Sequence, residues 1–162
     1  MRLTILAVGR LKSGAETELV DRYVERAAAL GRRLGLALTV GTIPESRAAR
    51  ATERLAEEAA ALRRAIPEGA IAVALDENGQ LLTSPELAAK LDGWRSSGQD
   101  IAFLIGGADG LGNGIKAECR LSLSFGRLTW PHQLARAMLA EQIYRAATII
   151  ANHPYHRGER DG

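Results

Sequence analysis

Short apolar runs alternate along this chain with longer segments in which apolar residues recur every three or four positions. The short runs have the length of buried strands, and the periodic segments have the spacing of one face of an amphipathic helix. Helices separate the runs, and this alternation predicts a single α/β domain with a mainly parallel sheet. The predicted strands are residues 3–8, 36–43, 70–75, 101–105 and 121–125, and the predicted helices are about 13–30, 46–66, 84–94, 115–119 and 130–151.

Residues with known turn and capping preferences mark several boundaries of these elements. The segment 76–79 contains Asp, Asn and Gly, which favour tight turns, so a turn is predicted there. Capping signals predict three helix starts: Ser13 with Glu16 as a capping box, Ser84 with Pro85, and Thr129 with Pro131 in the first turn.

The last predicted helix has an apolar face and an opposite face with longer polar side chains. The polar face carries Gln133, Arg136, Gln142 and Arg145. It follows a strand with alternating apolar residues and a loop that contains Gly126, where the backbone can bend or approach a ligand closely. The last quarter of the chain is therefore predicted to contain residues of the functional site.

The composition is that of an ordinary globular protein. The chain has 162 residues, a formal net charge of +2 and a single cysteine, Cys119. A charge this small does not by itself require a nucleic-acid partner, and 18 of the 21 basic residues are arginines, which either suits phosphate contacts or reflects codon usage. We find no signal peptide and no apolar stretch long enough for a membrane span, so the expected location is the cytoplasm.

Three predicted strands end in residues suited to ligand binding. In open α/β sheets, ligands bind beyond the carboxyl ends of the strands. These ends carry 75–77, Gly106-Gly107 and 126–131, so a pocket is predicted where they meet. The segment 9–14 has neither the dinucleotide GxGxxG pattern nor the Lys-Ser/Thr of a P-loop, which excludes both phosphate motifs there.

A metal site is not predicted. All three histidines, His132, His153 and His156, lie near the C-terminus, but the chain has only one thiol to add to them. Cys119 is expected to be a buried, unreactive thiol. Trp130 is left open between a core position and a site position.

The C-terminal segment 152–157 combines two imidazoles, a phenol and a guanidinium. Such groups can stack on bases, bind phosphate and move protons. A disordered chain end is the ordinary alternative for a terminal segment of this kind.

Together, these segments resemble one known family. The shared segments are 71–76, the sequence FLIGGADG at 103–110, the sequence LSLS at 121–124 with LTWPH at 128–132, EQIYR at 141–145, and YHR at 155–157. In order and spacing they are similar to the SPOUT-class methyltransferases that methylate N3 of a pseudouridine in bacterial large-subunit rRNA. The similarity runs from Met1 to about Arg157.

The resemblance implies a fold, a cofactor and partners. It implies one domain over residues 1–162, with a cofactor-binding trefoil knot over roughly 70–157, and a homodimer that uses S-adenosyl-L-methionine to methylate 23S rRNA in assembled ribosomes. Leu128 and Trp130 depart from residues frequent at these positions of the family. The implied cofactor-binding residues are Leu75, Gly106, Gly107, Gly126, Arg127, Leu128, Thr129, Trp130 and Pro131.

The chemistry of this reaction suggests the catalytic residues. Since the N3–H of pseudouridine is a weak acid, some group must take its proton or stabilise the resulting anion. Our candidates are His153, Tyr155, His156 and Arg157, on a tail expected to close over the partner subunit's site. With a charge of only +2, recognition of a shaped ribosomal surface is expected, with naked RNA a poor substrate. A catalytically silent ribosome-binding factor and a different nucleotide-binding enzyme are the alternatives.

Overall fold

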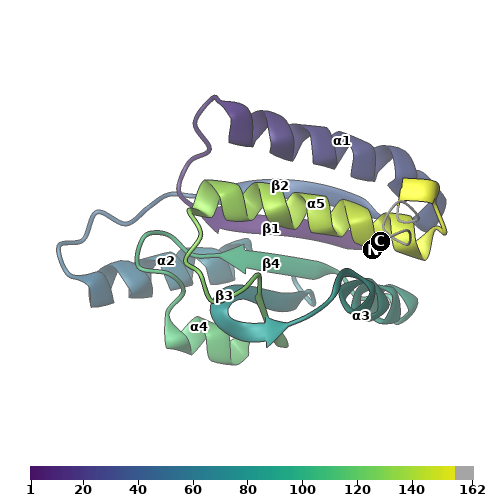
Figure 1. The fold of residues 1–162 in the computed structure, drawn as a ribbon. Helices are drawn as coiled ribbons and strands as arrows, with labels where there is room; N and C mark the ends of the chain where they lie inside the picture. The colour runs from purple at the N-terminus through teal and green to yellow at the C-terminus, as the bar shows by residue number, and fades with distance from the viewer. Residues whose placement is uncertain (156–162) are drawn as a thin grey trace.

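The computed structural model describes residues 1–155 and contains one five-stranded sheet with the strand order β2-β1-β4-β3-β5. Every neighbouring pair of strands is parallel. The predicted α/β class is therefore confirmed (Figure 1). The strands are β1 (Arg2–Val8), β2 (Ala37–Ile43), β3 (Ile71–Leu81), β4 (Ile101–Ile105) and β5 (Leu121–Ser124). The helices are α1 (Ala15–Leu34), α2 (Ala51–Ala65), α3 (Ser84–Ser96), α4 (Asn113–Glu118) and α5 (His132–Ile150).

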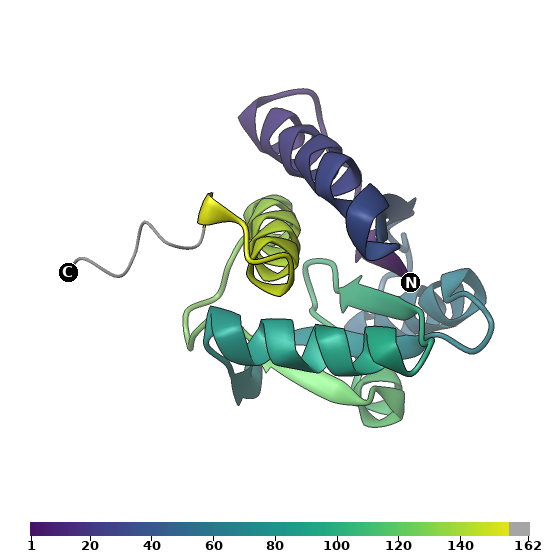
Figure 2. The ribbon, with the colours of Figure 1, turned by 90° about the vertical axis from the view of Figure 1, so that its right-hand side faces the viewer.

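Helices cover both faces of the sheet. Alternate residues of β1 enter two separate cores: Leu3 and Ile5 pack in the core with α1, α3 and α5, and Leu6 and Val8 pack in the core with α2 and α4. Figure 2 shows α5 lying between α1 and α3 on the first face. Strands β1 and β4 are buried on both faces over most of their length, which explains their nearly continuous apolar sequences. No helix of residues 1–155 has the length and apolar character needed to cross a membrane.

The start of α1 differs from the prediction. The N-cap residue is Gly14, and no side chain caps the helix, so the predicted capping box of Ser13 and Glu16 is wrong. Instead, the hydroxyl of Thr17 donates a hydrogen bond of 2.6 Å to the carbonyl of Lys12, which holds the β1–α1 loop.

Helix α2 begins five residues later than expected, at Ala51. The predicted start at Ser46 fails because that residue binds helix α2 from outside. Its backbone N–H donates to Glu58 Oε1 at 3.0 Å, and its hydroxyl donates to Glu57. The segment 46–50 is therefore a loop tied to the second turn of the helix that follows it.

The predicted turn at 76–79 is part of a longer strand. Strand β3 continues to Leu81, but its pairing with β5 slips, since Leu75 and Gln80 both lie opposite Leu123. Residues 76–79 thus form a wide irregularity of the kind that bends a strand. Within it, the Asp76 carboxylate accepts a hydrogen bond of 3.0 Å from the backbone N–H of Asn78.

Helix α3 is capped one residue earlier than predicted. Thr83 is the N-cap, and its side chain and that of Glu86 form a complete capping box. Ser84, the expected cap, instead donates to Gln142 Oε1 on α5 at 2.7 Å. The parallel sheet and its helices agree with the fold class of the resemblance, and the trefoil knot stays a prediction.

Candidate functional site

The irregular part of β3 and the loops that follow β4 and β5 enclose a cavity of about 350 Å³ at the carboxyl edge of the sheet. Figure 1 shows the loops after β1, β2 and β4 at the left of the molecule, together with the chain that enters α5. Arg127 does not line this cavity but a neighbouring hollow, and Pro131 is the N-cap of α5. The predicted cofactor residues that do line it are Leu75, Gly106, Gly107, Gly126, Leu128, Thr129 and Trp130.

The floor of the cavity is a tight glycine turn after β4. A Cβ atom on Gly106 would lie 2.2 Å from the backbone carbon of Gly110, so the close approach of the two chains requires glycine at that position. The N–H of Gly110 donates to the carbonyl of Gly107 at 3.0 Å, and Gly110 has a φ of 76°. The turn is anchored to α2, because Arg54 binds the Asp109 carboxylate at 2.7 and 3.1 Å. Backbone groups are therefore held in place against the cavity.

A side-chain contact joins two walls of the cavity. The hydroxyl of Thr129 donates a hydrogen bond of 2.9 Å to Glu77 Oε2, which connects the loop before α5 to the irregular part of β3. Thr129 therefore does not cap α5, and that prediction is wrong. Trp130 lines the cavity with its surface 40% exposed, so it is not a core residue.

An ion pair that the sequence did not reveal lies in the same cavity. Lys116 Nζ on α4 is 2.6 Å from Asp76 Oδ2, and both residues line the cavity. Burial raises the pKa of Asp76, but the hydrogen bonds from Lys116 and from the Asn78 N–H outweigh it, so the pKa lies below its ordinary value. The only available signal for Lys116 was its rarity, since the chain has three lysines.

His132, at the start of α5, also faces the cavity. Burial lowers the pKa of His132, the charge of Arg136 lowers it further, and the Glu45 carboxylate acts in the opposite direction. Its Nδ1 atom is buried and has no hydrogen-bond partner within residues 1–155. A neutral imidazole is therefore favoured at the cavity wall.

Arg136 is completely buried, although it was predicted to lie on the polar face of the last helix. Its Nη2 atom donates to the carbonyl of Gly9 at 2.8 Å, while Nε and Nη1 have no partner among the described residues. Burial lowers the pKa of Arg136. The prediction is wrong because helical spacing alone cannot show that β1 ends opposite this position.

Gly9 is the point where β1, β2 and α5 meet. Its N–H donates to the carbonyl of Ile43 at 2.9 Å, which joins the ends of β1 and β2. With a φ of 93°, it has a backbone conformation that favours glycine. A Cβ atom there would lie 2.8 Å from both His132 Cε1 and Glu45 Oε1. The cavity wall and the ends of the first two strands are therefore packed as one unit.

The C-terminal candidates that the structure describes, His153 and Tyr155, lie away from the cavity of their own chain. Helix α5 has 19 residues, so its C-terminal end is roughly 27 Å from its start at the cavity wall. Tyr155 packs on Tyr144 with ring centroids 4.9 Å apart, and the Arg145 guanidinium lies 5.2 Å from the Tyr155 ring centre. His153 is exposed, and its Nδ1 accepts a hydrogen bond of 3.2 Å from the Tyr155 N–H. His156 and Arg157 lie outside the described residues.

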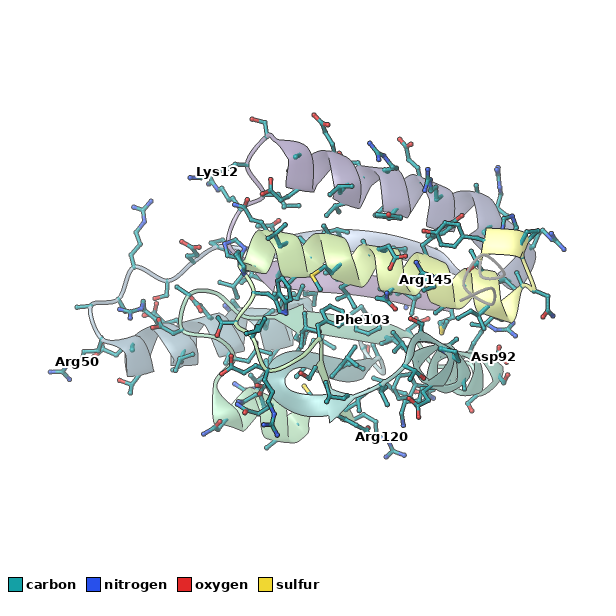
Figure 3. The ribbon with its side chains drawn as sticks, in the orientation of Figure 1. Lys12, Arg50, Asp92, Phe103, Arg120 and Arg145 are labelled. Carbon is teal, nitrogen blue, oxygen red and sulfur yellow. The ribbon has the colours of Figure 1, made fainter. Side chains whose placement is uncertain are left out.

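Tyr155 is also linked to an ion pair on α5. Its hydroxyl donates to Glu141 Oε1 at 3.4 Å, and Arg145 binds the same carboxylate at 2.8 Å. Burial raises the pKa of Tyr155, and Glu141 raises it further. The pair of Glu141 and Arg145 was expected as a helix-surface ion pair; it is present, with both side chains more than four-fifths buried. Figure 3 shows Arg145 at the end of α5 near the tail.

The single cysteine of the chain lies outside the lining of the cavity. Cys119 is partly buried, and its thiol donates to the carbonyl of Ile115 at 3.3 Å. Burial raises the pKa of Cys119, as expected for an unreactive thiol. Over residues 1–155, no group of three or more His, Cys, Asp or Glu side chains is arranged to hold a metal ion.

Comparison with known proteins connects this architecture to a family. The sequence model of a family described as "Predicted SPOUT methyltransferase" matches residues 1–156. A protein of Paracoccus denitrificans is 52% identical over 158 residues, covering 97% of this chain and 99% of its own length. One from Rhodopseudomonas palustris (strain BisA53) is 56% identical over 159 residues, with the same coverage. Both are named "Ribosomal RNA large subunit methyltransferase H".

The fold is also shared with a solved structure of low sequence identity. The structure of a probable methylase family protein from Haemophilus influenzae superimposes with a TM-score of 0.51 at 15% identity, covering 94% of this chain and 68% of the other. That likeness concerns the fold alone. The match of the family model over residues 1–156 and the relatives of similar length lead to one conclusion: the chain belongs to the SPOUT methyltransferase family.

Proposed function

We propose that this protein transfers the methyl group of S-adenosyl-L-methionine to N3 of a pseudouridine in 23S rRNA, on assembled ribosomes and as a homodimer. The names of relatives that are 52% and 56% identical over nearly the whole chain support methylation of large-subunit rRNA. The resemblance on residues 103–110 and 128–132 supports the finer assignment of the methylated atom. We further propose one domain over residues 1–162, with a cofactor-binding knot over roughly 70–157, in a cytoplasmic protein.

The cavity at the carboxyl edge of the sheet is the observation that carries the proposal. Its volume of about 350 Å³ lies in the range of small-molecule sites. The glycine turn brings backbone close to a ligand, because no Cβ atom fits at Gly106. The lining holds three carboxylates, those of Asp76, Glu77 and Asp109. Lys116 pairs with Asp76 and Arg54 pairs with Asp109, so the remaining negative charge of Glu77 favours a cationic sulfonium.

The residues proposed to bind the cofactor are those of the predicted set. Gly106, Gly107 and Gly126 would contribute backbone groups, and Thr129 would hold its loop against Glu77. When bound, S-adenosylmethionine supplies an electrophilic methyl group, so the protein must mainly hold the two reactants in line. The other members of the proposed set are Leu75, Arg127, Leu128, Trp130 and Pro131.

The acceptor nitrogen must lose its proton during transfer. The proposed groups are His153, Tyr155, His156 and Arg157, which could take the proton or stabilise the anion. Because the end of α5 lies roughly 27 Å from its own cavity, these groups would serve the cavity of the partner subunit. A neutral His132, held at the wall of the cavity, is a further polar group near the reacting atoms.

An apolar groove supports the homodimer. A cavity of about 630 Å³ lies between α1, α3 and α5 and is lined by residues such as Leu19, Leu87 and Met138. Leu81 and Leu134 also line it, and their surfaces are 65% and 37% exposed. Exposed apolar side chains around a groove are typical of an interaction surface. A second copy of the chain would bury them and bring its tail toward the cavity.

The proposal is tested by cofactor binding followed by methyl transfer. Calorimetry should show binding of S-adenosylmethionine, and ribosomes from cells that lack the protein should accept a tritiated methyl group. A short naked RNA hairpin should be a poor substrate, and light scattering should give the mass of a dimer. Binding of ribosomes without methyl transfer would instead support the silent ribosome-binding factor. A protein that does not bind the cofactor would contradict the proposal.

Single alanine substitutions test the tail. His153→Ala, Tyr155→Ala and His156→Ala should each lower the rate of methyl transfer while cofactor binding is retained. Leu128→Ala is a useful comparison, because this exposed side chain lines the cofactor cavity and should change cofactor affinity instead. Full activity in all three tail variants would exclude the proposed role of the tail.

A further inference from the structure

Basic side chains gather on the two loops that lie beside the cofactor cavity. The β1–α1 loop carries Arg10 and Lys12, and the β2–α2 loop carries Arg47 and Arg50. All four are exposed. Arg50 lies 3.7 Å from Glu53, whereas Arg10, Lys12 and Arg47 form no ion pair within the described part of the chain. We call these last three residues the basic edge.

The charge of these loops exceeds that of the whole protein. The segments 9–14 and 44–50 contain four cations and one carboxylate, Glu45, which gives +3, while the whole chain has a formal charge of +2. All remaining residues together therefore carry −1. These two loops thus carry a net positive charge while the rest of the chain carries a slight net negative one, so an anionic partner would be oriented by this edge.

The basic edge lies next to the cavity, as the order of the strands shows. Strand β1 is the neighbour of β4 in the sheet, and β2 follows β1. Because all the strands are parallel, their carboxyl ends lie along one edge, and the end of β2 is about 10 Å from that of β4. Figure 3 shows Lys12 and Arg50 on the side of the molecule where these loops lie.

Both loops are held in place by hydrogen bonds, so their cations project from a fixed backbone. The Gly9 N–H binds the Ile43 carbonyl, and the Gly9 carbonyl accepts from the buried Arg136. Farther along, Thr17 binds the Lys12 carbonyl at 2.6 Å, and Ser46 binds Glu58 at 3.0 Å. Less ordering of the backbone is then needed when a partner binds.

The residue types on these loops indicate contact with phosphates instead of bases. The segments 9–14 and 44–50 contain no aromatic residue, no histidine and no Asn or Gln. Base recognition in RNA mostly uses stacking on aromatic side chains and hydrogen bonds to base edges. Arginine and lysine without such residues are suited to the sugar–phosphate backbone, whose contacts position the nucleic acid.

We propose that Arg10, Lys12 and Arg47 bind backbone phosphates of the ribosomal RNA that flanks the target nucleotide, and so present that nucleotide to the cofactor cavity. This inference rests on the proposed function, since it names the surface by which the substrate RNA is held. Each contact displaces counterions from the RNA, so its loss should appear in the salt dependence of binding.

The test compares two triple variants with equal loss of charge. R10Q/K12Q/R47Q removes the basic edge, and R32Q/R33Q/R64Q removes three exposed cations from the last turns of α1 and α2, at the opposite edge of the sheet. Binding to ribosomes from cells lacking the protein is measured between 50 and 200 mM KCl. The slope of log affinity against log salt should fall by about 2 to 3 in the first variant, at roughly 0.7 to 0.9 per phosphate contact.

This difference in slope corresponds to a measurable change in affinity. Over the fourfold change in salt, the wild-type affinity should fall about 20- to 40-fold more than that of R10Q/K12Q/R47Q. The control variant should keep the wild-type slope. Calorimetry with S-adenosylmethionine should give the same affinity for all three proteins, and the methylation KM for ribosomes should rise in the first variant with kcat retained.

The outcomes separate this inference from the function on which it rests. A wild-type protein that methylates ribosomes, combined with an unchanged slope in R10Q/K12Q/R47Q, contradicts the basic edge alone. An equal loss of slope in both variants also contradicts it, because the charge effect would then be general. A wild-type protein that neither binds nor methylates ribosomes contradicts the proposed function and the basic edge together.

Discussion

Arg136 and Gly9 lie 127 residues apart in the chain and are joined by a hydrogen bond of 2.8 Å from Nη2 to the glycine carbonyl. The bond lies in the interior, since the exposed surface of Arg136 is 0%. It fixes the beginning of α5, just after the loop that lines the proposed cofactor cavity, to the end of β1. One turn earlier, His132 packs against the same glycine. The cavity wall is therefore attached to the sheet through a buried charge.

Replacement of Arg136 by Met should leave the protein at least as stable as the wild type. The guanidinium is buried, and its Nε and Nη1 atoms have no partner within residues 1–155, so its desolvation is poorly compensated. An apolar side chain of similar length removes that cost, as in other replacements of buried charges. Thermal unfolding should give a Tm no lower than that of the wild type. A large decrease would mean that ordered water or another group satisfies the guanidinium.

The same substitution should raise the pKa of His132. Burial and the charge of Arg136 both lower this pKa in the wild type, so removal of the charge moves it back toward the ordinary value of about 6.5. Because the folded-state pKa is depressed, the stability contributed by neutral His132 is present above about pH 6.5 and is lost as the pH falls. NMR titration of the imidazole in wild type and R136M measures the shift. The variant His132→Gln should lose this part of the pH dependence of unfolding.

Substitution of Gly106 by Ala should destabilise the glycine turn. The new Cβ atom would lie 2.2 Å from the backbone of Gly110, which cannot move away as a flexible side chain could. A loss of about 2 kcal/mol or more in the free energy of unfolding is expected. Gly93→Ala is the matched control, since it has open space in α3 and should stabilise by about 0.5–1 kcal/mol. If the two variants changed the free energy of unfolding in urea by the same amount, the turn would not be closely packed.

Replacement of Thr129 by Val should weaken cofactor binding with little effect on folding. Val has nearly the same shape but cannot donate to Glu77, so two walls of the cavity lose the hydrogen bond of 2.9 Å that joins them. A loss of roughly 1 kcal/mol, or about fivefold in affinity for S-adenosylmethionine, is expected in calorimetry. Thr129→Ser keeps the hydroxyl and should bind as the wild type does. Wild-type affinity in the Val variant would exclude a role for this contact.

Replacement of Lys116 by Met should raise the pKa of Asp76. Burial already acts in that direction, and the hydrogen bonds from Lys116 and the Asn78 N–H now outweigh it. The depressed pKa contributes stability above the ordinary pKa of an aspartate, and this contribution disappears as the pH falls through the folded-state value. The variant should therefore be less stable than the wild type at pH 7, with the difference shrinking toward low pH. Lys116→Arg should have nearly the wild-type free energy of unfolding, measured by urea titration at pH 7 and at low pH.

Local patterns in the sequence were sufficient to predict the strands and the position of the pocket. A parallel strand that is buried on both faces must be apolar along its length, so the runs in β1 and β4 could be located without knowledge of their neighbours. The glycine pair after β4 and the loop from Gly126 lie at strand ends, and parallel strands bring their carboxyl ends to one edge. Geometry of this kind follows from the sequence of elements alone, which is why most of the predicted cofactor residues surround one cavity.

Contacts between residues that are distant in the sequence determined the helix starts and the burial of Arg136, which local patterns could not show. Ser46 and Thr129 have side chains that commonly cap helices, but their hydroxyls donate instead to Glu57 and Glu77, which become neighbours only on folding. Arg136 falls on the polar side of a helical projection, yet the end of β1 covers it completely. A hydrogen bond or a burial site depends on which residues meet in space, and for residues more than a hundred positions apart only the tertiary structure determines that.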